Sequence, residues 1–383
     1  MTAYIRRSGI ALWLVLALFF LFSASSAHAD GGAPNLAYVA GTSHGVSIID
    51  VGQQKVTGSI NVAGDPHTIY LTVDGRLLAV TQPALNRVSV IATSSKQVIC
   101  SAAIPGQPTL LAFDPGTDTL YIAGNGANSV TALNPTTCAV QRTLHVGSVV
   151  YGLAVAVIGS GIAGGTGNQL WVADTNTLTV FDAQGKQVKT IAVPDGPQYL
   201  SIPTGSTLYA STRKGTVEAV DLNSYHLLPP LLTSGSFGPM DYDATTGEVY
   251  VPNQQRNLVE VLAPVSAGTT APHEPARSIR FDSAPQSVAI TSDGQFGFIA
   301  LADGKVAMLD IHARQVITTL AVGGSPRFII TGLYPSPFSY TPQQSILFNN
   351  ISNIVEYGGA VVVVLVVVIL LLRRRRRAAK PPV

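Results

Sequence analysis

Short apolar stretches alternate with polar turns along most of the chain from Leu36 onward. A typical unit has an apolar stretch after a proline, a turn such as Asp74-Gly75, and a strand such as residues 120–123. A polar loop and a further strand that ends in Asp follow. Runs this short, rich in β-branched residues and bounded by Gly, Pro, Asn and Asp, predict strands and not helices. The pattern therefore predicts an all-β protein.

The unit recurs at a regular spacing, and a Gly-x-Pro-like corner marks each repeat. Successive corners are 42, 41, 48, 42, 46 and 41 residues apart. Periods in the low forties with four short strands each are typical of β-propeller blades. The two long intervals contain insertions at 159–168 and 263–274, which we expect on loops. The corners lie at Pro66, Pro108, Val149, Pro197, Pro239, Pro285 and Pro326.

The two ends of the repeat region complement one another. Residues 36–62 supply three strands but no inner strand, whereas residues 326–330 read as an inner strand with nothing after it. We expect these segments to pair, because pairing removes the open sheet edge that a linear array would expose. The prediction is a seven-bladed β-propeller with four-stranded blades over residues 30–332, closed by its N- and C-terminal strands.

Three second strands carry a resemblance to a known family. Residues 120–123 (LYIA), 170–173 (LWVA) and 249–252 (VYVP) stand where YVTN-repeat β-propellers have their Tyr-Val-Thr-Asn strand, although that tetrapeptide itself never occurs here. The chain resembles this YncE-like group over about three quarters of its length. The resemblance implies the propeller fold. Members include surface-layer, adhesion and periplasmic proteins, and sugar-lactone hydrolases use similar blades, so the chemistry stays open.

The N-terminus has the form of an export signal. Arg6 and Arg7 precede an apolar run over residues 10–22, and the small-residue segment 27–29 (AHA) follows. This pattern predicts a signal peptide at residues 1–29. The alternative is an uncleaved membrane anchor.

The C-terminus predicts a membrane anchor. Residues 358–372 are apolar and five arginines follow directly, at 373–377. We expect a Pro-containing stalk at 333–353, a transmembrane helix at 354–372 and a basic cytoplasmic tail at 373–383. The propeller then lies outside the cell membrane. Removal of the tail by a sortase-like protease is the alternative.

Charge is concentrated at the two ends. Without Arg6, Arg7, the five-arginine run and Lys380, the body has 15 basic residues against 21 acidic ones, a net charge of about −6. A negative body is unsuited to collecting phosphates, which argues against a nucleic-acid partner.

Motifs for catalysis and cofactors are missing from the sequence. The histidines show no metal-ligand spacing, and haem, nucleophile-elbow and phosphate-loop motifs do not occur. We therefore expect no catalytic set, no metal and no cofactor. Recurrent acids at the ends of third strands are interpreted as turn caps and recurrent second-strand aromatics as packing between blades. These residues are Asp50, Asp182, Asp221 and Asp310, and Tyr121, Trp171, Tyr209 and Tyr250.

Cys100 and Cys138 are the only cysteines. Both fall on or beside the outer strands of neighbouring blades, and an even pair in an exported chain favours a disulfide. Blades diverge toward the rim, however, and a bridge needs Cα atoms within about 7 Å. The sequence leaves the bridge open.

Positions that differ between repeats are the candidates for recognition. The first residue after each corner should lie in a ring at the channel mouth, and the loop between the second and third strands should add a wider rim. The mouth residues are His67, Thr109, Val150, Gln198, Met240, Gln286 and Arg327, of which His67, Gln198, Gln286 and Arg327 are the ligand-binding candidates. The rim candidates are His44, Arg87, Asn125, Asp174, Arg213, Arg256 and Asp303.

These observations favour a membrane-anchored, non-catalytic binding module at the cell surface. Its ligand would be a protein, a carbohydrate or a small anion, and His67, Arg327 and Arg87 offer the densest group of donors. Two alternatives remain: a lactonase-like hydrolase with its site at the channel mouth, and a nucleic-acid-binding propeller of the YncE type.

Overall fold

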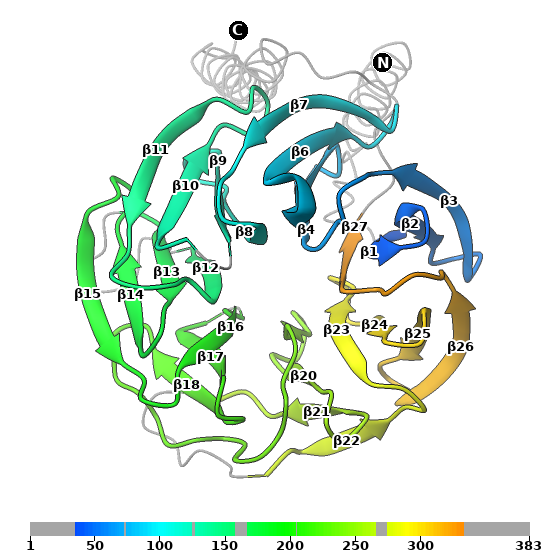
Figure 1. The fold of residues 1–383 in the computed structure, drawn as a ribbon. Coiled ribbons are helices and arrows are strands. Elements are labelled where there is room, and N and C mark those ends of the chain that lie inside the picture. Colours follow the sequence, from blue (N-terminus) through cyan, green and yellow to red (C-terminus); the bar gives the residue numbers. More distant parts are fainter. Residues whose placement is uncertain are drawn as a thin grey trace, which may run out of the picture. The chain divides into compact units, whose positions relative to one another are not determined.

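The computed structural model describes residues 35–332 except 73, 125–126, 158–166, 204 and 266–273. Seven antiparallel sheets stand around a common axis as the blades of a propeller (Figure 1), which confirms the predicted architecture. The chain divides into two units, 1–335 and 336–383. The signal peptide, stalk, transmembrane helix and basic tail expected from the sequence lie outside the described residues.

The strands are numbered along the chain, and each blade is given from its inner to its outer strand. Blade 1 is β27 (Phe328–Gly332), β1 (Leu36–Thr42), β2 (Gly45–Asp50) and β3 (Lys55–Asn61). Blade 2 is β4 (Ile69–Leu71), β5 (Leu77–Gln82), β6 (Arg87–Ala92) and β7 (Gln97–Ala103), with the short helix η1 (Pro83–Leu85) before β6. Blade 3 is β8 (Pro108–Asp114), β9 (Thr119–Gly124), β10 (Ser129–Leu133) and β11 (Val140–His145).

The remaining blades follow the same order. Blade 4 is β12 (Gly152–Ala156), β13 (Gln169–Ala173), β14 (Thr177–Phe181) and β15 (Gln187–Ala192). Blade 5 is β16 (Pro197–Ser201), β17 (Thr207–Thr212) and β18 (Val217–Asp221). Blade 6 is β19 (Asp241–Tyr242), β20 (Val249–Asn253), β21 (Leu258–Leu262) and β22 (Arg277–Arg280). Blade 7 is β23 (Pro285–Ile290), β24 (Phe296–Leu301), β25 (Lys305–Asp310) and β26 (Gln315–Ala321). Within these residues no helix is long and apolar enough to cross a membrane.

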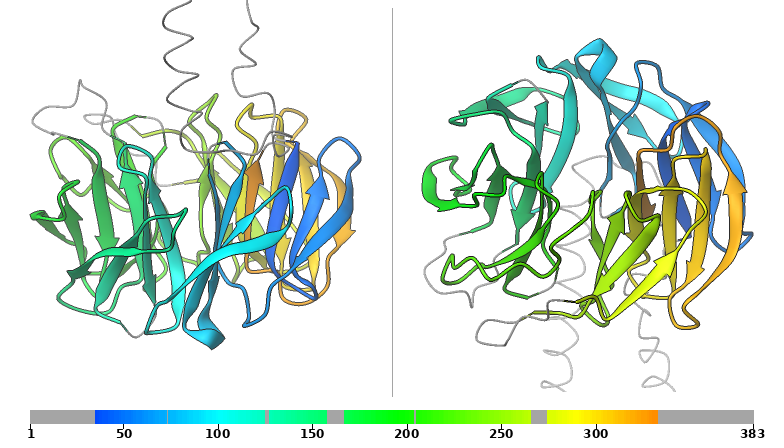
Figure 2. Two further views of the ribbon diagram at one scale, coloured as in Figure 1. Left: turned by 90° about the horizontal axis from the view of Figure 1, so that it is seen from above. Right: turned by 60° about the horizontal axis from the view of Figure 1, so that its bottom comes forward.

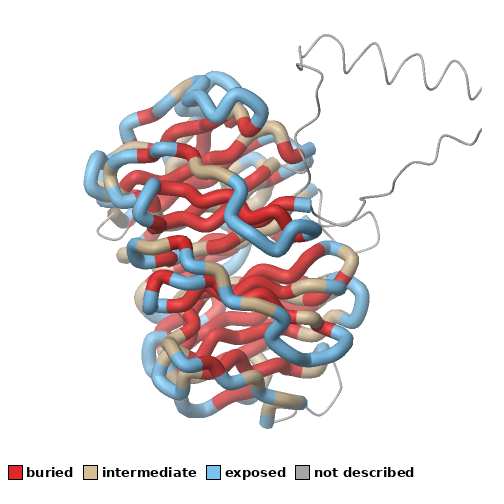
Figure 3. The backbone as a smooth tube through the Cα atoms, turned by 90° about the vertical axis from the view of Figure 1, so that its right-hand side faces the viewer, coloured by how far each residue is buried: buried red, intermediate tan, exposed pale blue. Residues whose placement is uncertain are grey.

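The second and third strands of the blades form the core. Every residue of β1, β2, β9 and β20 is buried, whereas most of the outer strand β15 is exposed. Figure 3 shows buried strands beneath more exposed outer segments on the side of the ring that faces the viewer. Because blades pack face to face, both faces of each sheet are covered, and the second strands are continuously apolar. One second-strand position carries a large buried ring in six blades, as the sequence predicted for four of them. These residues are Tyr38, Tyr121, Trp171, Tyr209, Tyr250 and Phe298.

The ring closes as predicted. Strand β27 pairs antiparallel with β1, from Leu36 opposite Gly332 to Ala40 opposite Phe328. The last strand of the chain is thus the inner strand of blade 1, and no sheet edge is left open between blades 1 and 7.

Blade 5 departs from the predicted four strands. Its sheet has three strands, and the segment that follows β18 pairs with it irregularly, through isolated bridges from Val220 to Leu227 and from Val217 to Leu232 and a few further backbone hydrogen bonds. Pro229 and Pro230 stand between these bridges. Proline has no backbone N–H to donate to a ladder, so the fourth strand cannot form here.

A disulfide joins Cys100 of β7 to Cys138, in the turn before β11, across blades 2 and 3. The two Cα atoms are 5.7 Å apart, within bridging reach despite the divergence of the blades.

Candidate functional site

The two ends of the propeller are built from different connections (Figure 2). We call upper the face that carries the connections from an outer strand to the next inner strand, such as 62–68; it points down in the left view of Figure 2. It also carries the loops between second and third strands, such as 83–86. The lower face carries the remaining turns. All of the predicted site residues that the structure describes belong to the upper face.

Backbone pairing fixes which residues share the mouth of the ring. The amides of His67 and Arg327 donate to Thr81 and Ala40 of their own second strands. The amides of Tyr151 and Gly238 make the equivalent bonds, to Ala173 and Pro252. The equivalents in blades 4 and 6 are therefore Tyr151 and Gly238, and the prediction of Val150 and Met240 was wrong. Both of those side chains are buried in the core, because the corners of these two blades are shifted along the chain relative to the others.

His67, Arg327 and Asp65 come together at the seam between blades 1 and 2. A guanidinium nitrogen of Arg327 lies 3.2 Å from Asp65 Oδ2, and the two side chains are 42% and 52% exposed. His67 Nδ1 lies 3.0 Å from Thr68 Oγ1, which in turn donates to the carbonyl of Thr109 in blade 3. His67 and Arg327 thus lie near one another across the closure seam, where the sequence placed them on adjacent blades, together with an acid that the sequence reasoning did not include.

This seam carries little net charge. Burial, and then the nearby Arg327 guanidinium, lower the pKa of His67 to about 4, while Asp65 partly opposes the shift. The imidazole is therefore neutral at physiological pH. Since Asp65 also balances Arg327, the cluster offers donors and an acceptor side by side and is a poor trap for a small anion.

A second exposed cation is fixed at the seam between blades 4 and 5. The Arg213 guanidinium lies 4.4 Å from the ring centroid of Tyr151 and donates to the carbonyl of Thr175 in blade 4. Gly196 makes room for it, since a Cβ there would lie 2.7 Å from the Arg213 side chain. Beside it, Lys214 pairs with Asp195 at 3.0 Å.

Three other rim candidates form hydrogen bonds or ion pairs with residues close to them. Arg87 donates to Gln82 Oε1 at 3.1 Å, and Arg256 donates to Ser234 and lies 3.7 Å from Glu260. Asp303 pairs with Lys305 at 2.6 Å.

Asp174 is a structural residue and not an exposed ligand group. It is buried and accepts hydrogen bonds from the amides of Asn176 and Thr177 and from two threonine hydroxyls. Asn125 lies outside the described residues. His44 is exposed at the edge of a hollow between blades 7 and 1.

The two predicted glutamines of the mouth shape the seams mainly through their backbones. The carbonyl oxygen of Gln198 would lie 1.7 Å from a Cβ on Gly152, and that of Gln286 would lie 2.3 Å from one on Gly238. Only glycine fits where neighbouring inner strands come this close.

Two buried glutamates on the third strands were missed by the sequence reasoning. Glu260 accepts from Asn253 Nδ2 at 2.9 Å. Glu218 accepts from Thr216, and its Oε2 has no hydrogen-bond partner in the described part of the chain. Burial, with repulsion from Asp195, raises the pKa of Glu218. A signal was present, because the same third-strand position is small or hydroxylated elsewhere. The other blades have Ser47, Ser89, Thr131, Thr179 and Ala307 there.

Asp241 is a third residue that the sequence reasoning missed. It lies on the inner strand β19, where the equivalent side chains of other blades are uncharged, and its Oδ2 accepts from the amide of Ile290 in blade 7 at 2.7 Å. Burial raises its pKa to about 6, although hydrogen bonds from the amides of Ile290 and Tyr242 oppose the shift. The carboxylate connects two inner strands.

The recurrent acids at the ends of third strands cap turns, as predicted. Each accepts a hydrogen bond from a backbone amide of the turn that follows: Gln53 to Asp50, Gln184 to Asp182, Ser224 to Asp221 and Ala313 to Asp310.

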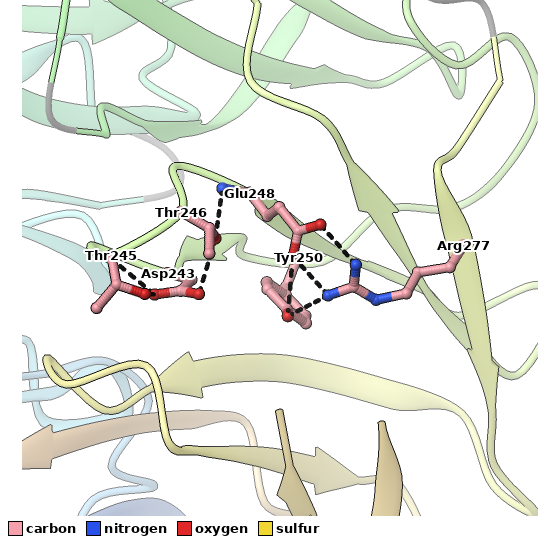
Figure 4. A network of polar contacts seen from close by, with 6 residues as sticks. All are labelled: Asp243, Thr245, Thr246, Glu248, Tyr250 and Arg277. Carbon is pink, nitrogen blue, oxygen red and sulfur yellow. Dashed lines mark hydrogen bonds and ion pairs between the residues drawn. The ribbon is translucent and has the colours of Figure 1, made fainter. Parts of the chain in front are cut away.

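The lower part of blade 6 holds a polar network (Figure 4). Arg277 donates to both oxygens of Glu248 and to the Tyr250 hydroxyl. Asp243 accepts from Thr245 and Thr246 in the adjoining turn. All of these contacts lie within blade 6, although Arg277 Nε has no hydrogen-bond partner in the described part of the chain. We interpret the network as structural.

The similarity of this chain to known proteins is one of fold alone. No protein-family model and no curated protein matches the chain. The periplasmic gluconolactonase PpgL of Pseudomonas aeruginosa superposes with a TM-score of 0.64 at 16% identity, over 78% of this chain and 99% of that one. A functionally unknown protein from Desulfotomaculum acetoxidans DSM 771 gives 0.65 at 13%, over 79% and 100%. Apo AztD from Citrobacter koseri gives 0.59 at 11%, over 79% and 99%.

These identities show a common fold and leave the chemistry undecided. Among the described residues, no three His, Cys, Asp or Glu side chains are grouped so as to hold a metal ion.

Proposed function

We propose that this chain is a membrane-anchored, extracytoplasmic binding module that recognises a protein partner through its upper face. The supporting observation is the way the charged side chains of this face are held. Arg327, Lys214 and Lys305 each pair with an acid, and Arg213 stacks on Tyr151. We further propose membership of the YVTN-repeat group, supported by the aromatic second strands.

Paired charges suit an extended partner. Each ion pair is nearly neutral, so the paired cations are poorly suited to capture free anions or nucleic acid. Pairs of both signs spread over several blades can match a complementary protein surface, because ordered charge arrangements favour specificity and fast association. Arg and Tyr are also the residue types enriched among interface hot spots, and the Arg213–Tyr151 stack is ordered before binding.

Cross-linking on intact cells tests this proposal. Protease added from outside should first release a propeller-sized fragment, which checks the orientation. A photoreactive residue introduced at Ser325 or at Ala302, both on the upper face, should then cross-link to the same partner protein in each case. The same probe at Ser95 or Gln295 on the lower face should not.

Charge reversal provides the matched control. The double variant Arg213→Glu with Arg327→Glu should reduce the common adduct at least tenfold without changing the melting curve, whereas Arg314→Glu on the lower face should not reduce it. Adducts from the lower face alone would contradict the proposal. Hydrolysis of a sugar lactone by the purified full chain would instead support the hydrolase.

A further inference from the structure

A hollow of about 470 Å³ opens between blades 7 and 1 at the rim of the propeller. Its volume is within the range of small-molecule sites. It is lined by Ser43, His44, Ser47, Val56, Gly58, Ser59, Ala321, Val322 and Gly323. No Asp, Glu, Lys or Arg is among these residues.

The lining combines hydroxyl groups, an imidazole and short apolar surfaces. Ser43 donates to the carbonyl of Val322, and Ser47 donates to Thr42 Oγ1. Neither the Ser59 hydroxyl nor the His44 ring makes a side-chain hydrogen bond to another described residue. These two groups can each donate and accept, so both can pair with a ligand hydroxyl.

A smaller hollow of about 280 Å³ occupies the same place in the repeat between blades 2 and 3. Thr131 and Thr143 face each other across β10 and β11, as Ser47 and Ser59 do across β2 and β3. The lining is Ile104, Pro105, Gly106, Ile122, Ala123, Gly124, Ala127, Ser129, Thr131 and Thr143. The recurrence shows that the hollow follows from the blade geometry.

A contrast with blade 2 indicates what keeps the two hollows open. There Gln82, at the end of the second strand, accepts from Ser89 and donates to the carbonyl of Ala63 in the connection from blade 1. Ser89 also shares a hydrogen bond with Ser101, the equivalent of Ser59. In blade 4, the equivalent residue is Asp174, which accepts a hydrogen bond from the Thr179 hydroxyl.

Blades 1 and 3 have no long side chain at this position. Blade 1 has Gly41 and the short Thr42, and blade 3 has Gly124. A Cβ at residue 124 would lie 2.0 Å from the carbonyl oxygen of Gly106, so the close approach of the backbone excludes any larger residue.

We propose that the hollow between blades 7 and 1 binds a neutral, hydroxylated ligand of the size of one sugar ring, and that the hollow between blades 2 and 3 is a weaker second copy. Hydroxyls and an imidazole match the alternating donors and acceptors of a sugar, while Val56 and Val322 cover its C–H face. The lining lacks the cation that a phosphate or carboxylate would require. This site does not depend on the upper-face partner.

Saturation-transfer NMR on the full chain in a sugar-free zwitterionic detergent tests the proposal. The probes are the methyl glycosides of glucose, galactose, mannose and N-acetylglucosamine, with gluconate as the charged comparison. At least one glycoside should receive saturation, and gluconate should receive less. Ser59→Leu, which fills the larger hollow, should remove more than half of the signal, and Thr143→Leu should remove a smaller part.

Matched controls lie on the same outer-strand position of other blades. Ser101→Leu and Thr190→Leu should leave the signal unchanged, and all four variants should melt like the wild type. The proposal is overturned if no glycoside receives saturation from the folded wild type, if Ser59→Leu binds like the wild type, or if Ser101→Leu lowers the signal equally. An unchanged signal in Thr143→Leu would rule out the second copy.

Discussion

Single side chains set the response of this propeller to pH, and two carboxylates in blade 6 respond in opposite directions. Burial raises the pKa of Asp241 to about 6. Burial also acts to raise the pKa of Asp243, but hydrogen bonds from Thr245 and Thr246 outweigh it and lower that pKa. The folded protein therefore binds a proton at Asp241 more tightly than the unfolded chain does, and one at Asp243 less tightly.

Asp241→Asn should stabilise the protein at high pH. Because the folded pKa of Asp241 is raised, its contribution to stability is present below the unfolded pKa of 3.8 and is lost as pH rises through about 6. Asparagine retains an oxygen for the Ile290 amide and carries no charge. We expect a gain of about 1 to 2 kcal/mol at pH 8 and almost none at pH 4, measured by urea unfolding, after allowing for partial exposure.

Asp243→Asn is the matched control. The folded pKa of Asp243 is lowered, so its contribution is present above the unfolded pKa and is lost as pH falls. This variant should lose stability at pH 8. A loss for Asp241→Asn at pH 8 as well would mean that the charged form of Asp241 is needed to hold blades 6 and 7 together.

The candidate residues of the rim could be predicted from the sequence, but their partners could not. Repeat spacing placed Arg327 and His67 near the same seam. Whether Arg327 would be free or paired depended on Asp65, which adopts a left-handed conformation with φ of 55° in the preceding connection. Loop conformations of this kind are not specified by hydrophobic periodicity.

Elements followed the repeat where the hydrophobic pattern was strong and departed from it where proline or a shifted corner intervened. Second and third strands, buried on both faces, were predictable from their apolar runs. The missing fourth strand of blade 5 follows from Pro229 and Pro230, whose effect on the ladder could have been read from the sequence. The displacement that makes Tyr151 and Gly238, and not Val150 and Met240, the residues at the mouth could not have been read from the sequence. Strand pairing, and not the corner residue, sets the register.

The disulfide between blades 2 and 3 should contribute measurably to stability. The cysteines are 38 residues apart, and closing a loop of that length in the unfolded chain corresponds to about 3 to 4 kcal/mol in the chain-entropy treatment. We expect Cys100→Ser with Cys138→Ser to lose about that amount in urea unfolding. Dithiothreitol should lower the stability of the wild type but leave that of the double variant unchanged, and equal stability of all samples would contradict the expectation.

At the scale of the whole molecule, ring closure was the most predictable feature, because an unpaired set of three strands at one end required an inner strand from the other. The ligand was the least predictable, since propellers of one fold serve many functions. Blade 1, whose inner strand closes the ring, also adjoins the Arg327 cluster and lines the hollow between blades 7 and 1. Ring closure and the two proposed recognition sites are therefore connected in blade 1.

Deletion of residues 326–332 tests this connection. Blade 1 would lose its inner strand, and β1 would expose an unpaired edge. We expect the cooperative thermal transition to broaden and shift downward by more than 10 °C, consistent with a loss of several kcal/mol. A deletion of equal length in the insertion at 266–272 is the control and should melt like the wild type. An unchanged transition after removal of β27 would show that the ring does not depend on closure.

Pairing of β1 with β27 also imposes an order of events in time. Leu36 and Gly332 are 296 positions apart, so β1 leaves the ribosome about 15 to 60 s before its partner at ordinary rates of synthesis. Until then blade 1 is incomplete, although blades 2 to 7 have all of their strands. The step that closes the ring therefore falls to β27, the last of the described strands to be synthesised.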